Sequence, residues 1–203
     1  MKPVHTITGT MAPLDRANID TDQIIPQTFL KRIERTGYGE FLFHSWARHP
    51  DGTLRDEFVL NRPEYRGAAV LVAGPNFGCG SSREHAAWAI QDWGFDAVIT
   101  ESAADIFRNN AHNIGMVVVE LPHDDVTTLM TLAGDPDREV LIDLETQTVT
   151  AGDVEFRFAI EPTVKHRLRN GLDAIAVTMG AEAEIVAHET GRPGWMPTLG
   201  TAS

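Results

Sequence analysis

The spacing of apolar positions predicts alternating strands and helices in the middle of the chain. A continuous run of small or β-branched apolar residues, typical of a strand buried on both faces, occupies residues 68–73, and two further strands are predicted at residues 97–100 and 116–121. Segments with helical periodicity follow these predicted strands, at residues 81–93, 103–110 and 124–133. Since strands that alternate with helices are joined by crossover connections, we expect these strands to form a parallel sheet.

The two ends of the chain show other patterns. Residues 4–11 indicate a further strand, and three short segments separated by turn residues are predicted antiparallel strands, at 140–144, 146–150 and 154–160. A helical region begins at Pro162 and is interrupted by glycines. We therefore predict an α/β fold, with one domain over residues 1–190 and a flexible tail over 191–203. Its sheet is mixed, with a small antiparallel section, and helices follow at the C-terminal end.

Between the first predicted strand and residue 68 no single period dominates. Residues 18–26 indicate a polar loop and a short apolar element that proline ends. Residues 27–48 are irregularly helical and rich in arginine and lysine for this chain. We expect residues 31–60 to form a mobile insert in the isolated protein, because the basic residues there need an anion or an interface.

Composition narrows the class of protein. The formal net charge is −12, which disfavours nucleic-acid binding, because phosphates require a basic face. No apolar stretch approaches the ~20 residues of a membrane-spanning helix, and residues 1–6 contain no apolar signal region, so we expect a cytoplasmic protein. Cys79 is the only cysteine, which excludes an internal disulfide and a metal cluster held by several thiolates of this chain.

The segment Asn76-Phe77-Gly78-Cys79-Gly80-Ser81-Ser82-Arg83-Glu84-His85-Ala86 holds the candidate chemistry. A buried strand ends in a glycine-rich loop that enters a helix, and Ser81 and Glu84 have the spacing of a capping box. The helix start offers unpaired N–H donors and a partial positive charge, and the Arg83 guanidinium has a geometry that matches a carboxylate. The spacing thus indicates an anion-binding loop that contains two hydroxyl groups.

Other interpretations of this loop exist. The glycines alone are compatible with a tight turn and a serine cap without any ligand. A phosphate-binding loop is excluded because no Gly-Lys-Ser/Thr follows the glycines, and the glycine spacing does not fit a dinucleotide fingerprint. Cys79 has no evident histidine partner, and a lone cysteine in a turn is more often unreactive.

The same segment resembles the signature of the small subunits of isopropylmalate isomerases and of the matching domain of aconitases. The resemblance extends to residues 18–26, to Ala103–Asn110 and to Gly171-Leu172-Asp173, and so covers most of the chain. It implies an aconitase-type swivelling domain. The insert at residues 31–60 and the C-terminal helices favour the isopropylmalate branch.

The resemblance implies a hydro-lyase that converts 2-isopropylmalate to 3-isopropylmalate through 2-isopropylmaleate, a step of leucine biosynthesis. In the family a four-iron, four-sulfur cluster acts as the Lewis acid. One cysteine cannot hold such a cluster, so we expect no cofactor on this chain and the cluster on a large partner subunit. By motif position Ser81 takes the role of the base, and Gly80, Ser82 and Arg83 bind the substrate.

The resemblance also assigns supporting and specificity roles. Three residues are expected to support the loop or to meet the large subunit: Asp20, Thr21 and Asp22. Four more are expected to support the loop: Asn76, Gly78, Glu84 and His85. In the loop at residues 27–32, Phe29 and Leu30 suit an isopropyl group, and Lys31 or Arg32 suits a second carboxylate. Two alternatives stay open: a homoaconitase-like or methylmalate-type dehydratase subunit, and a non-catalytic module that binds a small carboxylate alone.

Overall fold

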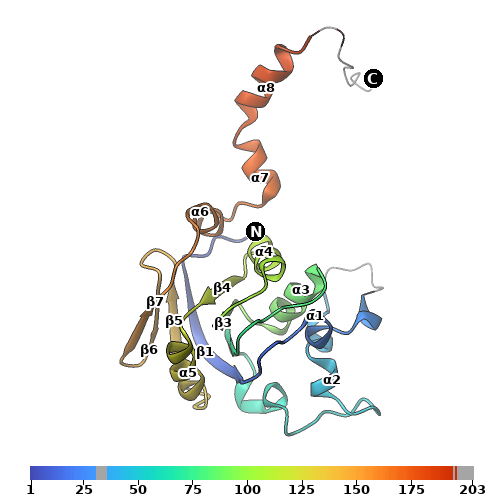
Figure 1. Cartoon of the computed structure of the whole chain (residues 1–203), viewed down its shortest axis with the longest axis vertical. Coiled ribbons are helices and arrows are strands. Elements are labelled where there is room, and N and C mark those ends of the chain that lie inside the picture. Colours follow the sequence, from blue (N-terminus) through green and yellow to red (C-terminus); the bar gives the residue numbers. More distant parts are fainter. Residues whose placement is uncertain (31–35, 194, 196–203) are drawn as a thin grey trace.

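A computed structural model describes residues 1–30, 36–193 and 195 of the chain. Its centre is a seven-stranded mixed sheet with the strand order β4-β3-β2-β1-β5-β6-β7, covered by helices on both faces (Figure 1). The mixed α/β architecture predicted from the alternating pattern is therefore confirmed. No helix in the described part of the chain is long and apolar enough to cross a lipid bilayer.

Half of the sheet is parallel. Strands β1 (Thr6–Leu14), β2 (Val70–Ala73), β3 (Ala97–Thr100) and β4 (Val117–Glu120) are neighbours in this order and run the same way. Every residue of β2 is buried, as the continuous apolar run predicts, and every residue of β3 is buried as well. All four strands therefore end at the same edge of the sheet, where their loops meet.

The other half is an antiparallel meander. Strands β5 (Glu139–Asp143), β6 (Thr148–Ala151) and β7 (Val154–Arg157) pair antiparallel in chain order. Strand β1 joins the two halves, because its residues 11–14 pair with β2 while its residues 6–10 pair with β5. This long strand extends beyond the predicted residues 4–11 and holds both halves in one sheet.

One face of the sheet carries most of the helices. Helices α3 (Glu84–Trp93) and α4 (Asp105–Ile114) lie on it beside the short helices α1 (Thr21–Ile24) and α2 (His44–Ala47). Four single turns of 3-10 helix complete this layer, η1 (Gln27–Phe29), η2 (Gly39–Phe41), η3 (Val59–Asn61) and η4 (Pro63–Tyr65). Within the predicted insert, Tyr38, Phe43 and Phe58 are buried in the core of this face.

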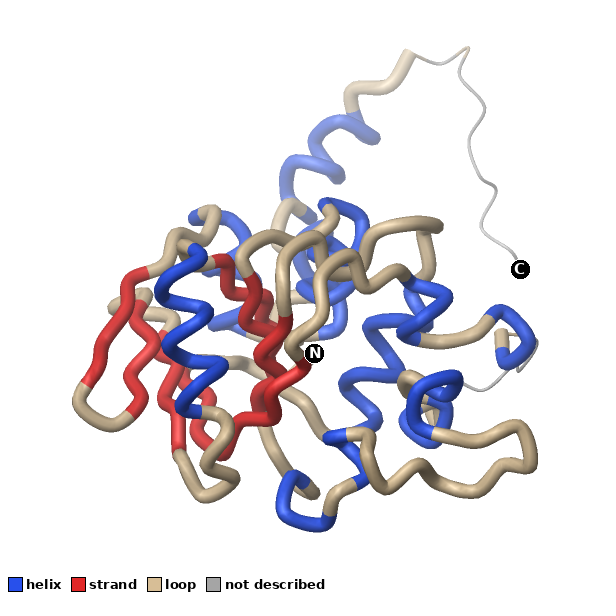
Figure 2. The backbone as a smooth tube through the Cα atoms, turned by 60° about the horizontal axis from the view of Figure 1, so that its bottom comes forward, coloured by secondary structure: helices blue, strands red, loops and turns tan. Residues whose placement is uncertain are grey.

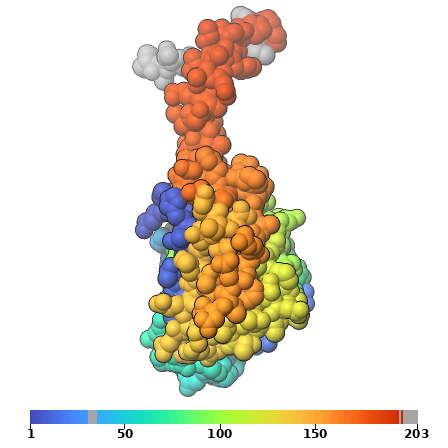
Figure 3. All heavy atoms as spheres, turned by 90° about the vertical axis from the view of Figure 1, so that its left-hand side faces the viewer, coloured from blue at the N-terminus to red at the C-terminus, as the bar shows by residue number. Residues whose placement is uncertain are grey.

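The opposite face is covered by helix α5 (His123–Leu132), which packs on β1 and β2, and by α6 (Pro162–Asn170) (Figure 2). Helices α7 (Ala174–Met179) and α8 (Glu182–Thr190) project from this body (Figures 1 and 3). Ile175, Met179 and Val186 on these two helices are more than half exposed. The helical region predicted from Pro162 onward thus corresponds to the three helices α6, α7 and α8.

One predicted helix boundary is wrong. The helix expected over residues 81–93 begins at Glu84, and its N-cap is Arg83, which has an extended backbone and no side-chain capping bond. The predicted capping box of Ser81 and Glu84 is therefore absent. A capping box forms instead at α1, where the Asp20 side chain accepts from the Gln23 N–H and the Gln23 side chain accepts from the Asp20 N–H.

Candidate active site

The loop between β2 and α3, which we call the serine loop (residues 74–83), runs beside the segment that leads into α1. The Gly78 N–H donates to the Ile19 carbonyl at 2.7 Å, and the Thr21 N–H donates to the Cys79 carbonyl at 2.9 Å. Asp20 and Cys79 thus form an isolated parallel bridge. This short ladder brings together two segments that carry the family resemblance, residues 18–26 and residues 76–86.

The tip of the serine loop is open to solvent. Gly80, Ser81 and Ser82 are exposed, whereas Thr21 behind them is 2% exposed. The Thr21 hydroxyl donates to the Ser81 carbonyl at 2.9 Å. Ser81 and Ser82 therefore lie at the surface, on a backbone that hydrogen bonds from the buried Thr21 hold in place.

Arg83 is held beside this tip by an ion pair. Its guanidinium donates a hydrogen bond to the Asp22 carboxylate, with the Arg83 side chain 12% exposed and that of Asp22 54% exposed. The hydrogen bond from Arg83 lowers the pKa of Asp22 below its ordinary value. The geometry shows an arginine that already binds one carboxylate at the edge of the loop.

Close packing against helix α4 explains why residue 78 is a glycine. Its φ is +71°, and a Cβ atom there would lie 2.3 Å from the Phe107 Cγ atom. The Phe107 ring packs edge-to-face against Phe77, with centroids 5.1 Å apart. The glycine therefore lets α4 pack closely against the loop, because any larger residue at this position would collide with Phe107.

Asn76 braces the start of the loop from two directions. Its side-chain amide donates to Asn18 at 2.8 Å, and its backbone N–H donates to the Ser102 hydroxyl at 2.9 Å. The Ser102 carbonyl accepts from the Phe77 N–H at 2.9 Å. The buried Thr100 hydroxyl donates to the Gly74 carbonyl at 2.7 Å. Sequence reasoning missed Thr100 and Ser102, because neither belongs to a motif with a recognisable spacing.

The first turn of α3 connects the serine loop to the insert. The His85 ring packs against Trp88 and Tyr38, with centroid distances of 4.7 Å and 5.3 Å. Burial lowers the pKa of His85; the negative charge of Glu84 opposes this shift, and the positive charge of Arg83 adds to it. Glu84 is exposed in the first turn, where a negative charge is favourable to the helix dipole. His85 is thus a packing contact for Tyr38 as well as a neighbour of the loop.

The predicted specificity residues are described in part. The Phe29 ring stacks on Phe41 at a centroid distance of 4.1 Å and contacts His44 at 4.8 Å, and Leu30 is half-buried against the same core. Lys31 and Arg32, predicted to bind a second carboxylate, lie outside the described residues. Phe29 and Leu30 are therefore placed in the layer that covers the helical face of the sheet.

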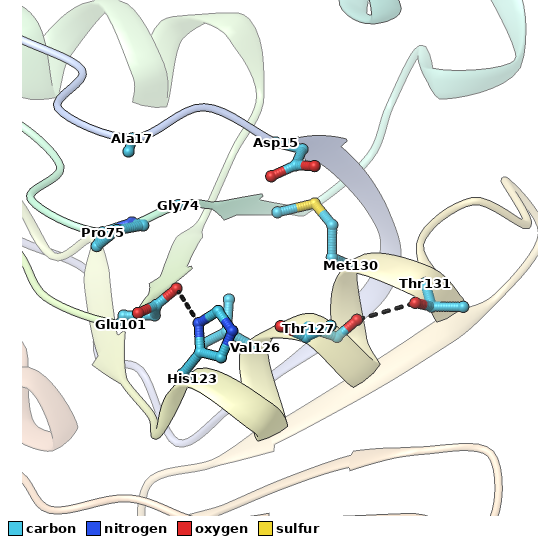
Figure 4. A pocket seen from close by; sticks show the side chains of 10 residues that line it. All are labelled: Asp15, Ala17, Gly74, Pro75, Glu101, His123, Val126, Thr127, Met130 and Thr131. Carbon is cyan, nitrogen blue, oxygen red and sulfur yellow. Dashed lines mark hydrogen bonds and ion pairs between the residues drawn. The ribbon is translucent and has the colours of Figure 1, made fainter.

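A cleft of about 740 Å³ opens at the same edge of the sheet (Figure 4). The loops after β1, β2 and β3 and the helix α5 contribute to it. Its described lining residues are Asp15, Ala17, Gly74, Pro75, Glu101, His123, Val126, Thr127, Met130 and Thr131. The His123 ring lies 2.9 Å from the Glu101 carboxylate, and that contact raises the pKa of His123. Gly74 and Pro75, at the start of the serine loop, line this cleft, whereas none of the predicted site residues does.

The described residues do not fit a metal cluster. Across residues 1–30 and 36–193, no three side chains of His, Cys, Asp or Glu are placed to hold a metal ion. The single cysteine, Cys79, is half-buried with its backbone in the ladder to α1. A four-iron cluster needs more thiolates than this chain possesses.

Comparison with known proteins places this geometry in a family. Residues 1–124 match the model of the aconitase C-terminal domain, and residues 127–162 match a model described as LeuD_N. The 3-isopropylmalate dehydratase small subunit of Rubrobacter xylanophilus is 50% identical over 200 residues, or 98% of this chain and 100% of the relative. That of Geobacillus kaustophilus is 51% identical over 190 residues, or 93% of this chain and 96% of the relative.

A solved structure has the same fold. The crystal structure of 3-isopropylmalate dehydratase (leuD) from Methanocaldococcus jannaschii matches with a TM-score of 0.65 and 24% sequence identity. The match covers 92% of this chain and 99% of that chain. With about half of all positions shared with full-length relatives and the fold in common, the chain belongs to the family of 3-isopropylmalate dehydratase small subunits, within the aconitase superfamily.

Proposed function

We propose that this chain is the small subunit of a two-subunit hydro-lyase that isomerises 2-isopropylmalate to 3-isopropylmalate through 2-isopropylmaleate, in the cytoplasm. The observation that supports the proposal most directly is the exposed Ser81 hydroxyl beside the paired Arg83, on a loop braced from three segments of the chain. The family membership supplies the substrate, and the loop supplies the groups that this chain contributes.

Ser81 takes the role of the base that removes the proton next to a substrate carboxylate. A free serine hydroxyl is too weak an acid to lose its proton near neutral pH, so the site must stabilise the resulting oxyanion. Backbone N–H donors of the loop and the positive charge of Arg83 lie next to Ser81 in the chain and are suited to this task. Ser82, exposed beside it, is a hydrogen-bond donor for the substrate.

Arg83 binds a substrate carboxylate by exchanging partners. In the free chain Asp22 occupies one edge of the guanidinium, and we propose that its exposed side chain turns outward when substrate arrives. Since both partners are carboxylates, the exchange replaces one charge-assisted hydrogen bond by another and leaves no buried cation unpaired. Asp22 thus keeps Arg83 oriented before the substrate binds.

A large subunit must complete the site. We propose that it carries the four-iron, four-sulfur cluster, the Lewis acid that helps hydroxide leave, because this chain has one cysteine. Phe29 and Leu30, with Lys31 and Arg32, are proposed to meet the substrate's side group and second carboxylate. With a net charge of −12 we expect no nucleic-acid partner, and we expect no membrane association.

The experiment mixes the purified chain with a cluster-loaded large subunit without oxygen and follows the absorbance of 2-isopropylmaleate formed from 2-isopropylmalate. Ser81→Ala is compared with Ser45→Ala, a control at an exposed serine of α2. We expect turnover in the mixture, loss of turnover with Ser81→Ala at unchanged association, and normal turnover with the control.

The two alternative functions predict different results in this experiment. A stable complex without turnover of 2-isopropylmalate, but with turnover of a methylmalate or of a homoaconitase substrate, would move the substrate assignment. Carboxylate binding by the chain alone, with no complex, would identify an independent binding module and overturn the proposal.

A further inference from the structure

Thr21 lies behind the serine loop, and the family resemblance implies for it only a general role in supporting the loop or meeting the large subunit. It is 2% exposed, at the first position of α1, and it hydrogen-bonds the loop twice. Its N–H donates to the Cys79 carbonyl and its hydroxyl to the Ser81 carbonyl, both at 2.9 Å. A single residue therefore fixes the carbonyls on both sides of the loop tip.

These two bonds determine where the loop's own donors point. In a planar trans peptide the C=O and N–H groups point in opposite directions. With the Cys79 and Ser81 carbonyls turned toward α1, the N–H groups of Gly80 and Ser82 are turned away from α1, on the exposed side of the loop. Neither N–H has a hydrogen-bond acceptor among the described residues.

The conformation of Gly80 fits this arrangement. Its φ of +93° lies in the region that L side chains rarely adopt, and a Cβ atom there would be 3.4 Å from Asp20. The turn at Gly80 allows the carbonyls of Cys79 and Ser81 both to accept hydrogen bonds from Thr21. The loop tip is therefore a pair of outward N–H donors that flank Ser81, held open by Thr21.

We propose that Thr21 is a positioning residue for the reaction: its hydroxyl orients the Ser81–Ser82 peptide so that the Ser82 N–H, with that of Gly80, stabilises the Ser81 oxyanion. This inference rests on the proposed function, because it assumes that Ser81 is the base. Thr21 itself touches neither the substrate nor the reacting proton.

Three variants test the hydroxyl. Thr21→Val keeps the shape and the backbone bond to Cys79 but removes the donor to the Ser81 carbonyl, and Thr21→Ser keeps the donor. Thr148→Val is the matched control, a buried threonine of β6. In the assembled enzyme we expect Thr21→Val to lower kcat by ~10–100-fold with KM changed less than threefold, since a misdirected oxyanion donor affects the transition state.

Two further readouts separate positioning from folding. The rate with Thr21→Val should need a higher pH, because a less stabilised oxyanion raises the pKa of Ser81, while Thr21→Ser should restore the rate to within about threefold of the unmodified enzyme. In the isolated chain, amide NMR signals of Gly80 and Ser82 should broaden or divide with Thr21→Val and keep their positions with Thr148→Val.

The outcomes are distinct. An unchanged kcat and pH profile with Thr21→Val, or a loss with Thr21→Ser as large as with Thr21→Val, would overturn the role of the hydroxyl. If the unmodified mixture does not turn over 2-isopropylmalate, the proposed function fails, and the NMR signals then decide the positioning alone: unchanged Gly80 and Ser82 signals in Thr21→Val would refute it.

Discussion

Replacing Gly78 with alanine should destabilise the fold by an amount that the loop geometry sets. The backbone at φ +71° costs an L residue roughly 1–2 kcal/mol. The new Cβ atom would also lie 2.3, 2.5 and 2.8 Å from three atoms of Phe107, which is 1% exposed and cannot turn into solvent. Overpacking of this kind adds about 1–3 kcal/mol, so we expect a total of about 2–5 kcal/mol.

Gly67→Ala is the matched control, because Gly67 has φ +83° but nothing within 4 Å of its added Cβ atom. It should show the backbone cost alone, ~1–2 kcal/mol. Urea unfolding of the isolated chain measures both variants, with the shift in midpoint converted at constant slope. The difference between the two variants is the steric contribution of Phe107. A Gly78→Ala chain no less stable than Gly67→Ala would refute the packing explanation.

Three further outcomes are expected. Burial, and after it the charge of Arg108, lowers the pKa of His112 to about 4. The contribution of the neutral ring to the free energy of unfolding is therefore complete above the unfolded pKa of 6.5 and is lost as the pH falls toward 4. We expect a pH dependence of ~3 kcal/mol in the free energy of unfolding, which urea unfolding of His112→Gln should lack. The lowered pKa of Asp22 gives stability above pH 3.8 that disappears as pH falls through its folded value, so Asp22→Asn and the unmodified chain should converge in stability at the lowest pH. Mobility of residues 31–60 in the isolated chain stays a prediction: rapid amide exchange should appear there, and strong protection throughout residues 31–48 would contradict it.

The aromatic contacts of the insert and of Phe29 before it give this region a structural role, in addition to the specificity role that we propose for it. Phe29 stacks on Phe41, and Tyr38 packs on His85 of the first turn of α3. Residues on both sides of the undescribed segment 31–35 therefore contact the layer that carries the serine loop. A substitution of Tyr38 would be expected to disturb α3 as well as the insert, because Tyr38 is fully buried.

The order and type of the elements were determined by the sequence itself, because they depend on local signals. A continuous apolar run predicted the buried strand β2, and the glycines that interrupt the helical pattern after Pro162 predicted a helix end, as at Gly171. The lone cysteine likewise excluded a resident cluster without any coordinates. Each of these statements needs no contact between distant residues.

The serine loop shows what required the tertiary structure. Ser81 and Glu84 have the spacing of a capping box, yet the Ser81 carbonyl is bound by Thr21 and the loop continues in extended form to Arg83. Thr21 is 60 residues away in the sequence, and Ser102, which braces the start of the loop, follows a different strand. A local capping bond is worth about 1 kcal/mol, so several hydrogen bonds to distant segments outweigh it. The spacing of residues in the sequence does not predict these hydrogen bonds, because they form only when the folded strands bring their ends to the same edge of the sheet.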